Sequence, residues 1–162
     1  MKDNNNFVIR FAEVKDVQLI LQFIHELAEY EKLRNEVVAT EELLRENVFN
    51  KKMAEVIIGE YEGEPVGFAL FFHNFSTFIG KPGIYLEDLY VRQQYRNRGF
   101  GKMLLSHLAK LAVERDCGRL EWSVLNWNEP SIQFYKNLGA IPMNDWTVYR
   151  VHDDSLKNLA KL

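Results

Sequence analysis

Cysteine is nearly absent from this sequence, which has Cys117 alone among 162 residues. A single cysteine excludes an internal disulfide and a metal site made only of cysteines, and it favours a reducing compartment, so we expect a cytoplasmic protein. Long apolar runs are missing too, because the longest, Val66–Phe72, is interrupted by Gly67 and is far shorter than the roughly 20 residues of a membrane helix. The polar residues 1–6 contain no apolar signal segment, and we expect them to be disordered.

Linkers rich in proline, glycine or serine, internal repeats and low-complexity segments are absent as well. The composition has 47% hydrophobic and 27% charged residues, which is enough to build a core. A chain near 150 residues buries roughly 68–70% of the surface that its unfolded state exposes. These figures predict one folded domain over residues 7–162.

A basic excess is also lacking, since the net charge is −3, and this argues against a nucleic-acid-binding protein. The charge is unevenly distributed along the chain. Residues 1–64 carry 14 acidic and 8 basic side chains, and residues 65–162 carry 9 and 12. Scattered solvated charge explains this split, and so does a protein that meets a cation with one region and an anion with another.

The pattern of apolar residues predicts alternating strands and helices. We expect strands at 7–11, 53–61, 65–73, 84–91, 119–125 and 147–151, and helices at 17–28, from 40, from 101, and at 129–138. Asp16 is placed to cap the first helix, and Glu62-Gly63-Glu64 predicts an antiparallel hairpin. Asn128 is the predicted N-cap of the last helix, which ends before Gly139. Hairpins combined with a crossover predict an α/β fold around a mixed sheet.

The segment Arg92–Lys102 lies between a predicted strand and a predicted helix. Its glycines let the backbone approach a ligand, and a helix start leaves N–H groups without partners. An anion, in particular a pyrophosphate, suits such a turn, and Arg92, Arg96, Arg98 and Lys102 add positive charge. An ordinary strand-to-helix turn with solvated arginines explains the same composition.

Two nucleotide-binding motifs and a metal site are excluded. A Walker loop ends in Gly-Lys-Ser/Thr, but Gly101-Lys102 is followed by Met103. A dinucleotide fingerprint needs a third glycine where Leu104 stands. The histidines are scattered without the spacing of metal ligands, so we expect no metal.

The hexapeptide Arg96–Gly101, Arg-Asn-Arg-Gly-Phe-Gly, resembles the R/Q-x-x-G-x-G/A loop of the GCN5-related N-acetyltransferases (GNAT), which holds the pyrophosphate of acetyl-CoA. The resemblance extends over nearly the whole chain and narrows to the diamine (spermidine/spermine) N-acetyltransferase branch. The other segments that carry it are Phe7–Arg10, Glu26–Glu31, Tyr85–Asp88, Trp127–Ile132 and Phe134–Lys136. It implies a single domain with a mixed, mostly antiparallel central sheet flanked by helices, acetyl-CoA as co-substrate, and a homodimer.

The resemblance also implies functional residues. Glu87 would hold the ammonium group of the substrate and help to remove its proton, and Tyr135 would protonate the departing thiolate. The cofactor would be bound by Leu89, Tyr90, Val91, Asn97, Arg98, Gly99, Phe100, Gly101, Lys102, Asn128, Glu129, Pro130 and Ser131. The amine would be bound by Tyr30, Glu31, Glu87, Glu121, Trp122 and Ser123.

The residue types themselves, apart from the resemblance, favour or limit some of these roles. Glu87 and Asp88 are adjacent on a predicted strand, so they point to opposite faces unless a bulge intervenes, and Asp88 has no predicted catalytic role. Tyr30 and Glu31 suit an aliphatic cation through charge and cation–π contact, although a solvated helix end explains them too. The phenol of Tyr135 has an ordinary pKa near 10 and a thiol one near 8.5. Proton transfer from the phenol to the thiolate is therefore unfavourable by about 1.5 pKa units, roughly 2 kcal/mol, which an enzyme can tolerate.

The resemblance implies an acetyl-CoA-dependent N-acetyltransferase that acts on a primary amine of a small cationic substrate by direct attack in a ternary complex. Diamines, polyamines and thialysine-like amino acids stay open as substrates. Two alternatives are a peptide or protein N-acetyltransferase and a non-catalytic acyl-CoA-binding regulator. The Tyr30-Glu31 patch favours a small cation over a peptide, and the presence of both Glu87 and Tyr135 argues against a regulator.

Overall fold

The computed structural model describes residues 6–162. The predicted disorder of residues 1–6 therefore falls almost entirely outside the described residues. Asn6 itself accepts a backbone hydrogen bond from the N–H of Glu62 at 3.1 Å. The chain forms two compact units, one ending at Ser123 and the other spanning Val124–Leu162.

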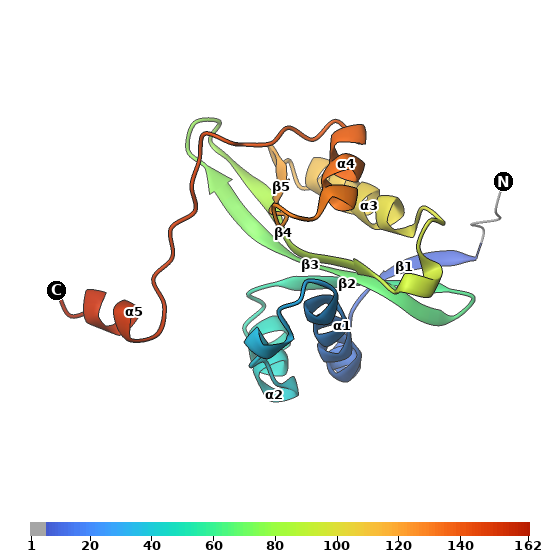
Figure 1. The fold of residues 1–162 in the computed structure, drawn as a ribbon, viewed down its shortest axis with the longest axis horizontal. Helices are drawn as coiled ribbons and strands as arrows, with labels where there is room; N and C mark the ends of the chain where they lie inside the picture. The colour runs from blue at the N-terminus through green and yellow to red at the C-terminus, as the bar shows by residue number, and fades with distance from the viewer. Residues whose placement is uncertain (1–5) are drawn as a thin grey trace. The chain divides into compact units, whose positions relative to one another are not determined.

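The first unit is built on a five-stranded sheet in the order β1-β2-β3-β4-β5 (Figure 1). The strands are β1 (Phe7–Phe11), β2 (Glu55–Tyr61), β3 (Glu64–Ser76), β4 (Lys81–Val91) and β5 (Leu120–Trp122). The first four strands pair antiparallel, and β4 pairs with β5 in parallel. The predicted α/β class with a mixed, mostly antiparallel sheet is confirmed.

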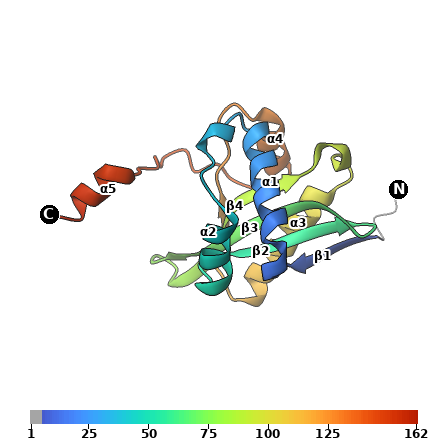
Figure 2. The same ribbon diagram turned by 90° about the horizontal axis from the view of Figure 1, so that it is seen from below.

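Helices cover both faces of this sheet. They are α1 (Val17–Tyr30), α2 (Glu41–Leu44), which continues as a π-helical turn over Arg45–Asn50, and α3 (Phe100–Glu114). Figures 1 and 2 show α1 and α2 on one face and α3 on the other. Short 3₁₀ turns occupy Val14–Asp16, Arg34–Glu36 and Gln93–Tyr95.

The core of the first unit is formed by apolar side chains on the two faces of the sheet. Under α1, the ring of Phe23 stacks on that of Phe68 with centroids 5.2 Å apart. On the α3 face, the ring of Phe7 stacks on that of Phe100 at 4.3 Å. All four rings are buried, so both helices are fixed by aromatic contacts to the sheet.

Asp16 stands at the predicted N-cap position of α1, but its side chain makes no capping hydrogen bond. The Asp16 carboxylate accepts hydrogen bonds from two nitrogens of Arg10, at 2.8 and 2.9 Å, and from the backbone N–H of Glu13 at 2.8 Å. The Arg10 guanidinium is the main reason that the pKa of Asp16 is lowered. A buried carboxylate beside an arginine gains more from this ion pair than from a neutral N–H at the helix end.

The second unit contains two helices, α4 (Glu129–Asn137) and α5 (Asp153–Leu159). The predicted cap of α4 is confirmed, because the Asn128 side chain accepts a hydrogen bond from the backbone N–H of Ser131 at 3.4 Å. Gly139 follows the helix with φ of +86°, a left-handed conformation that glycine adopts readily.

The predicted strand over residues 147–151 is wrong, because the structure has no strand there. Val148 and Tyr149 of this segment are 81% and 92% exposed. β-Branched and aromatic residues favour a strand only where a neighbouring strand supplies backbone hydrogen bonds and packing. The short helix α5, by contrast, has few apolar residues and left no periodic pattern in the sequence.

Candidate active site

Strand β4 contains a bulge at Glu87. Leu70 of β3 pairs with Asp88 and the next residue, Phe71, pairs with Leu86, so Glu87 has no partner on β3. Paired residues share a face of the sheet, which places Asp88 on the face of Leu70. Glu87 alternates with Leu86 and therefore points to that same face. The bulge thus brings two adjacent carboxylates to one face.

This face is the one covered by α1. Beyond the bulge, Tyr90 pairs with Phe68. The ring of Phe23 on α1 contacts both, with centroids 6.3 Å from Tyr90 and 5.2 Å from Phe68. The side chains of Asp88 and Tyr90, two residues apart, therefore lie on the α1 side of β4.

The end of α1 adds a third carboxylate. Tyr30 is the last residue of the helix and Glu31 is its C-cap. Burial, with the negative charges of Glu87 and Glu31, raises the pKa of Asp88 to about 7. Burial and the charge of Glu87 also raise the pKa of Glu31. We call Glu31, Glu87 and Asp88 the acidic cluster; their mutual repulsion is relieved when a cation binds among them.

Three of the six predicted amine-binding residues lie at the end of β5 or directly after it, and two of these three share the face of the acidic cluster. Glu121 pairs with Tyr85, whose hydroxyl lies 2.7 Å from that of Ser123. Tyr85 is separated from Glu87 by one residue, so Glu121 and Ser123 face the α1 side. Trp122 pairs with Leu86 and lies on the opposite face. The structure therefore does not bring Trp122 together with its two neighbours.

The loop before α3 presents backbone N–H groups. The α-helical hydrogen bonds begin with the N–H of Met103, which donates to the carbonyl of Gly99 at 3.0 Å. Gly99 has φ of +86° and forms the N-cap. The N–H groups that precede this first bond belong to Phe100, Gly101 and Lys102.

Space in front of this turn is open. A Cβ atom at Gly101 would meet only Cγ2 of Val91, at an ordinary distance of 3.9 Å. No protein atom in the described chain therefore requires glycine at position 101. Asn97, with φ of +61°, turns the chain ahead of the helix.

The arginines of the loop do not act together. Arg92 donates to both carboxylate oxygens of Glu26, at 3.1 and 3.0 Å, with its guanidinium 4.8 Å from the ring centre of Phe23. The guanidinium of Arg98 lies 5.3 Å from the ring of Tyr61. The expectation that the whole basic set from Arg92 to Lys102 faces phosphates is therefore wrong for Arg92, whose charge is paired on α1.

Arg96 also points away from the loop. Its Nε donates to the carbonyl of Val91 at 2.9 Å. Its guanidinium lies 4.6 Å from the ring centre of Tyr30 and 5.6 Å from that of Tyr90. Arg96 thus connects the loop to the end of α1.

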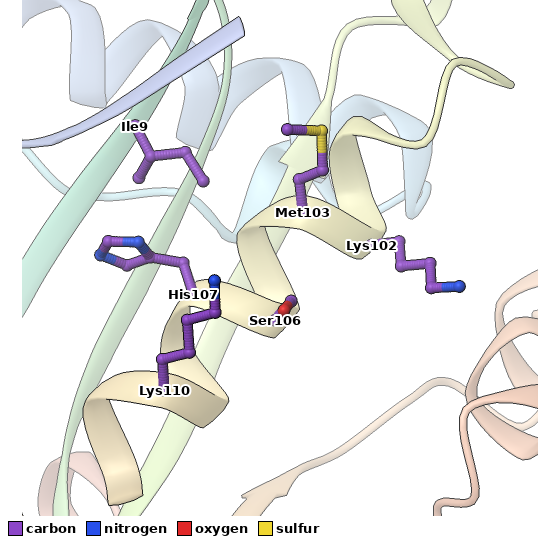
Figure 3. Close-up of a pocket in the computed structure, with 6 residues that line it drawn as sticks. All are labelled: Ile9, Lys102, Met103, Ser106, His107 and Lys110. Carbon is purple, nitrogen blue, oxygen red and sulfur yellow. The ribbon is translucent and has the colours of Figure 1, made fainter. Parts of the chain in front are cut away.

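Lys102 lines a shallow groove between β1 and α3 with a volume of about 290 Å³. Figure 3 shows its side chain directed away from Ile9 and His107, which face each other across the groove. Lys110 completes the basic side chains there. None of the residues of the acidic cluster lines this groove.

The edge of β4 is open beyond its pairing with β5. That pairing covers only Ile84, Tyr85 and Leu86. β4 continues to Val91 without further partners on this side among the described strands. The backbone of Leu89, Tyr90 and Val91 therefore has an edge at which an extended ligand can form hydrogen bonds.

The remaining predicted residues belong to α4. Tyr135 is half-buried, and its ring centre lies 5.4 Å from that of Phe134. Asn128 is buried and holds the start of the helix through Ser131. Glu129 and Pro130 are exposed in its first turn. The second unit thus presents the predicted acid on one short, capped helix.

Asp88 and Arg96 are the two residues of this site whose placement the sequence reasoning missed. A change of apolar phase marks the bulge beside Asp88: Ile84 and Leu86 are apolar at even positions, and Leu89 and Val91 at odd positions. That change could have revealed that both carboxylates share a face. No comparable pattern marks the contact of Arg96 with a helix far away in the sequence.

The described residues contain neither a metal site nor a membrane-spanning helix. Within residues 6–162 no group of three or more His, Cys, Asp or Glu side chains has an arrangement that could hold a metal ion. Among the helices of the same residues, none combines the length and apolar character needed to cross a membrane.

The family of this chain is shown by its likeness to known proteins. The chain matches the acetyltransferase (GNAT) family over residues 21–140, a match that includes parts of both units. A solved structure of an integron cassette protein from the mobile metagenome of V. cholerae superimposes with a TM-score of 0.80 and 28% identity, covering 97% of this chain and 99% of that one. The chain belongs to the acetyltransferase (GNAT) family.

Relatives place it within a branch of that family. It is 36% identical to the thialysine N-epsilon-acetyltransferase of Bos taurus, over 94% of this chain and 96% of that protein. It is 31% identical to the spermidine/spermine N(1)-acetyltransferase-like protein 1 of Homo sapiens, over 95% of this chain and 24% of that protein. The predicted resemblance to the diamine N-acetyltransferase-like branch is confirmed, and the enzyme is an N-acetyltransferase.

Proposed function

We propose that this N-acetyltransferase transfers the acetyl group of acetyl-CoA to a primary amine of a small cationic substrate, by direct attack in a ternary complex. Diamines, polyamines and thialysine-like amino acids are the substrate classes that fit. The observation that carries this proposal is the acidic cluster of Glu31, Glu87 and Asp88 on the α1 face of the sheet. A relative named for thialysine supports a substrate of this kind.

The acidic cluster binds the substrate through its charge. Three carboxylates held together cost free energy through repulsion, and an ammonium group removes that cost. Tyr30, next to Glu31 in the chain, already has the Arg96 guanidinium over one face of its ring, 4.6 Å from the centre, so a substrate cation would meet the other face. Glu121 and Ser123 lie on the same face, where Glu121 is paired with Arg119 and Ser123 with the Tyr85 hydroxyl, each at 2.7 Å, so a second polar group of the substrate would share or replace these contacts. Trp122 lies on the other face and has no role in this scheme.

Nucleophilic attack requires a neutral amine. An alkylammonium has a pKa near 10 and must lose its proton before it attacks. Glu87 is exposed at the bulge, where solvent can reach it. It accepts this proton, directly or through one water molecule, and holds the ammonium before transfer. Because attack follows deprotonation within one complex, no acyl-enzyme and no nucleophilic cysteine are needed.

The segment from β4 to α3 has the features that acetyl-CoA requires. The cofactor supplies the acetyl group as a thioester. The pyrophosphate is held by the N–H groups of Phe100, Gly101 and Lys102 and by the turn at Asn97–Gly99. Space for it lies in front of Gly101. The open edge of β4 at Leu89–Val91 binds the pantetheine arm and polarises the thioester carbonyl through backbone N–H groups.

The second unit supplies the acid. Tyr135 on α4 donates a proton, or a hydrogen bond, to the thiolate that leaves. The start of that helix consists of the N-cap Asn128 and the first-turn residues Glu129, Pro130 and Ser131. Backbone N–H groups at a helix start again suit an anionic or polar arm of the cofactor.

A thiol-release assay with acetyl-CoA tests the proposed function. The amine panel contains spermidine, 1,3-diaminopropane, thialysine, an uncharged-tail primary amine and a peptide with a free N-terminus. We expect release with the cationic amines at rates well above the others. Preference for the peptide would support the peptide N-acetyltransferase instead, and CoA binding without turnover of any amine would support the regulator.

We also propose that the enzyme is a homodimer whose residues 7–162 form one acetyltransferase domain. The second unit exposes apolar side chains that a monomer leaves in water, namely Ile141, Met143, Trp146, Val148 and Tyr149. A second copy of the chain covers such a surface. Cys117 is a free thiol, which supports the reducing cytoplasm as the location.

A further inference from the structure

Arg96 is the first residue of the Arg-x-x-Gly-x-Gly motif, yet its side chain is used on the amine side of the molecule. Its Nε is bound to the carbonyl of Val91 at 2.9 Å. The guanidinium lies over the rings of Tyr30 and Tyr90, 4.6 and 5.6 Å from their centres. Both rings belong to the α1 face of β4 and the helix that covers it. Arg96 therefore connects the loop before α3 to the end of α1, where Glu31 of the acidic cluster follows Tyr30.

Tyr30 is the residue that lies between Arg96 and the acidic cluster, because it contacts Arg96 and precedes Glu31 in the chain. It is the last residue of α1, its side chain is exposed, and Glu31 follows it directly. The backbone of this helix end is closed by the N–H groups of Glu31 and Leu33, which donate to the carbonyls of Leu27 and Ala28 at 2.9 and 2.8 Å, so the side chain of Tyr30 is the part that Arg96 can orient. A guanidinium above the ring attracts it, and the hydrogen bond to Val91 fixes the guanidinium itself. Arg96 thus contributes to the orientation of the Tyr30 ring, next to Glu31 in the chain.

We propose that Arg96 is a positioning residue of the amine site, which orients the ring of Tyr30 beside the acidic cluster. The proposal rests on the proposed function in one respect, that the cluster binds the amine. Arg96 does not touch the amine in this scheme, and its effect on acetylation passes through Tyr30. This role differs from one in which the first arginine of the motif serves the phosphates.

Two other arginines of the same segment provide matched controls. Arg98 makes an analogous contact with different rings, those of Tyr61 and Tyr95, at 5.3 and 5.7 Å. Arg92 anchors the middle of α1 through Glu26 and Phe23 rather than its end. A variant of Arg98 therefore tests whether an effect of Arg96 is specific to Tyr30, and not to any stacked arginine in the loop.

The contact can be measured without activity by fluorine NMR. Protein labelled with 3-fluorotyrosine has seven tyrosine signals, and Tyr30→Phe assigns the one of Tyr30. We expect Arg96→Ala and the milder Arg96→Lys to shift the Tyr30 signal, while Arg98→Ala shifts those of Tyr61 and Tyr95 and leaves Tyr30 in place. A Tyr30 signal that does not move in either Arg96 variant overturns the proposal.

Kinetics then distinguish positioning from phosphate binding. We expect Arg96→Ala to raise KM for the amine on the order of tenfold while the Kd of CoA changes less than about twofold. Arg96→Lys, which keeps the charge and the fold but lacks the planar group, gives an intermediate value. A weaker affinity for CoA with an unchanged amine KM would make Arg96 a phosphate ligand and overturn the proposal.

A double variant completes the test. Tyr30→Ala and Arg96→Ala should each raise the amine KM, and the combined variant should be no worse than the more damaging single change, because both remove one contact. Additive effects would show that Arg96 acts by another route. If the wild type acetylates no amine, the proposed function fails, and the Tyr30 fluorine signal alone decides whether Arg96 holds Tyr30.

Discussion

Glu87 and Asp88 are neighbours in the sequence and lie on the same face of β4, because Glu87 has no partner on β3. Regular alternation would have turned one of them toward α3. The bulge instead places both carboxylates beside Glu31 at the end of α1. A local irregularity of one strand is thus what concentrates negative charge on the face proposed to receive the amine.

Replacement of Glu87 by Gln removes the proposed proton acceptor without changing the size of the side chain. We expect activity to require a higher pH than in the wild type, because an ammonium with pKa near 10 must then lose its proton to solvent. The measurement is kcat/KM for the amine between pH 6 and 10. An unaltered pH profile would count against the role of Glu87 in deprotonation.

Replacement of Asp88 by Asn changes how stability depends on pH. Burial raises the pKa of Asp88 from 3.8 to about 7 in the folded protein, so the folded state holds this proton more tightly than the unfolded state. Asp88 is therefore neutral in both states at low pH, and its ionisation costs stability as pH rises from about 4 to about 7, up to about 4 kcal/mol.

The asparagine of the Asp88→Asn variant does not ionise. The Tm of the variant should therefore rise relative to that of the wild type as the pH increases from 5 to 8. Thermal unfolding of both proteins at matched ionic strength measures this difference. A Tm difference that stays constant over that range would show that Asp88 is not held in the proposed environment.

Several strands and helices could be predicted from local patterns, because each has its own periodicity. β1, the hairpin of β2 and β3, and the helix over Phe100–Glu114 are of this kind. The predicted strand over residues 147–151 is wrong, since a strand depends on a partner that its own composition does not reveal. The expected capping hydrogen bond of Asp16 is absent for a similar reason, because Arg10, on another element, forms hydrogen bonds with the Asp16 carboxylate.

The site was predicted to a similar extent. Tyr30, Glu31 and Glu87 were named from the family resemblance, and the structure of the first unit brings the two carboxylates close enough for each to affect Asp88. Strand alternation places Trp122 and Glu121 on opposite faces, and the pairing of Trp122 with Leu86 shows which face each one takes. The direction of the Arg96 side chain depends on a helix more than 60 residues earlier in the chain, which no local motif encodes.

Replacement of Tyr135 by Phe tests the acid. The variant keeps the ring next to Phe134 and loses only the hydroxyl. We expect kcat to fall much more than the affinity for CoA, because the hydroxyl acts on the leaving thiolate and not on the bound cofactor. The measurements are steady-state kinetics and CoA titration on the same preparation. An unchanged kcat would remove Tyr135 from the mechanism.

Removal of residues 146–162 tests the homodimer. Trp146, Val148 and Tyr149 are more than three-quarters exposed in this segment, and their burial by a second copy would stabilise a dimer. We expect light scattering to give a dimer for the full chain and a monomer for the shortened one, with circular dichroism as the control for folding. A full-length monomer would contradict the proposal.

The most direct test of the central claim compares a diamine with a monoamine of equal length. The account predicts that thiol release from acetyl-CoA is faster with 1,3-diaminopropane than with propylamine at low substrate concentration, and that Glu31→Gln reduces this preference, because Glu31 belongs to the acidic cluster. Equal rates for the two amines, or a preference that Glu31→Gln leaves unchanged, would contradict an amine site built from these carboxylates.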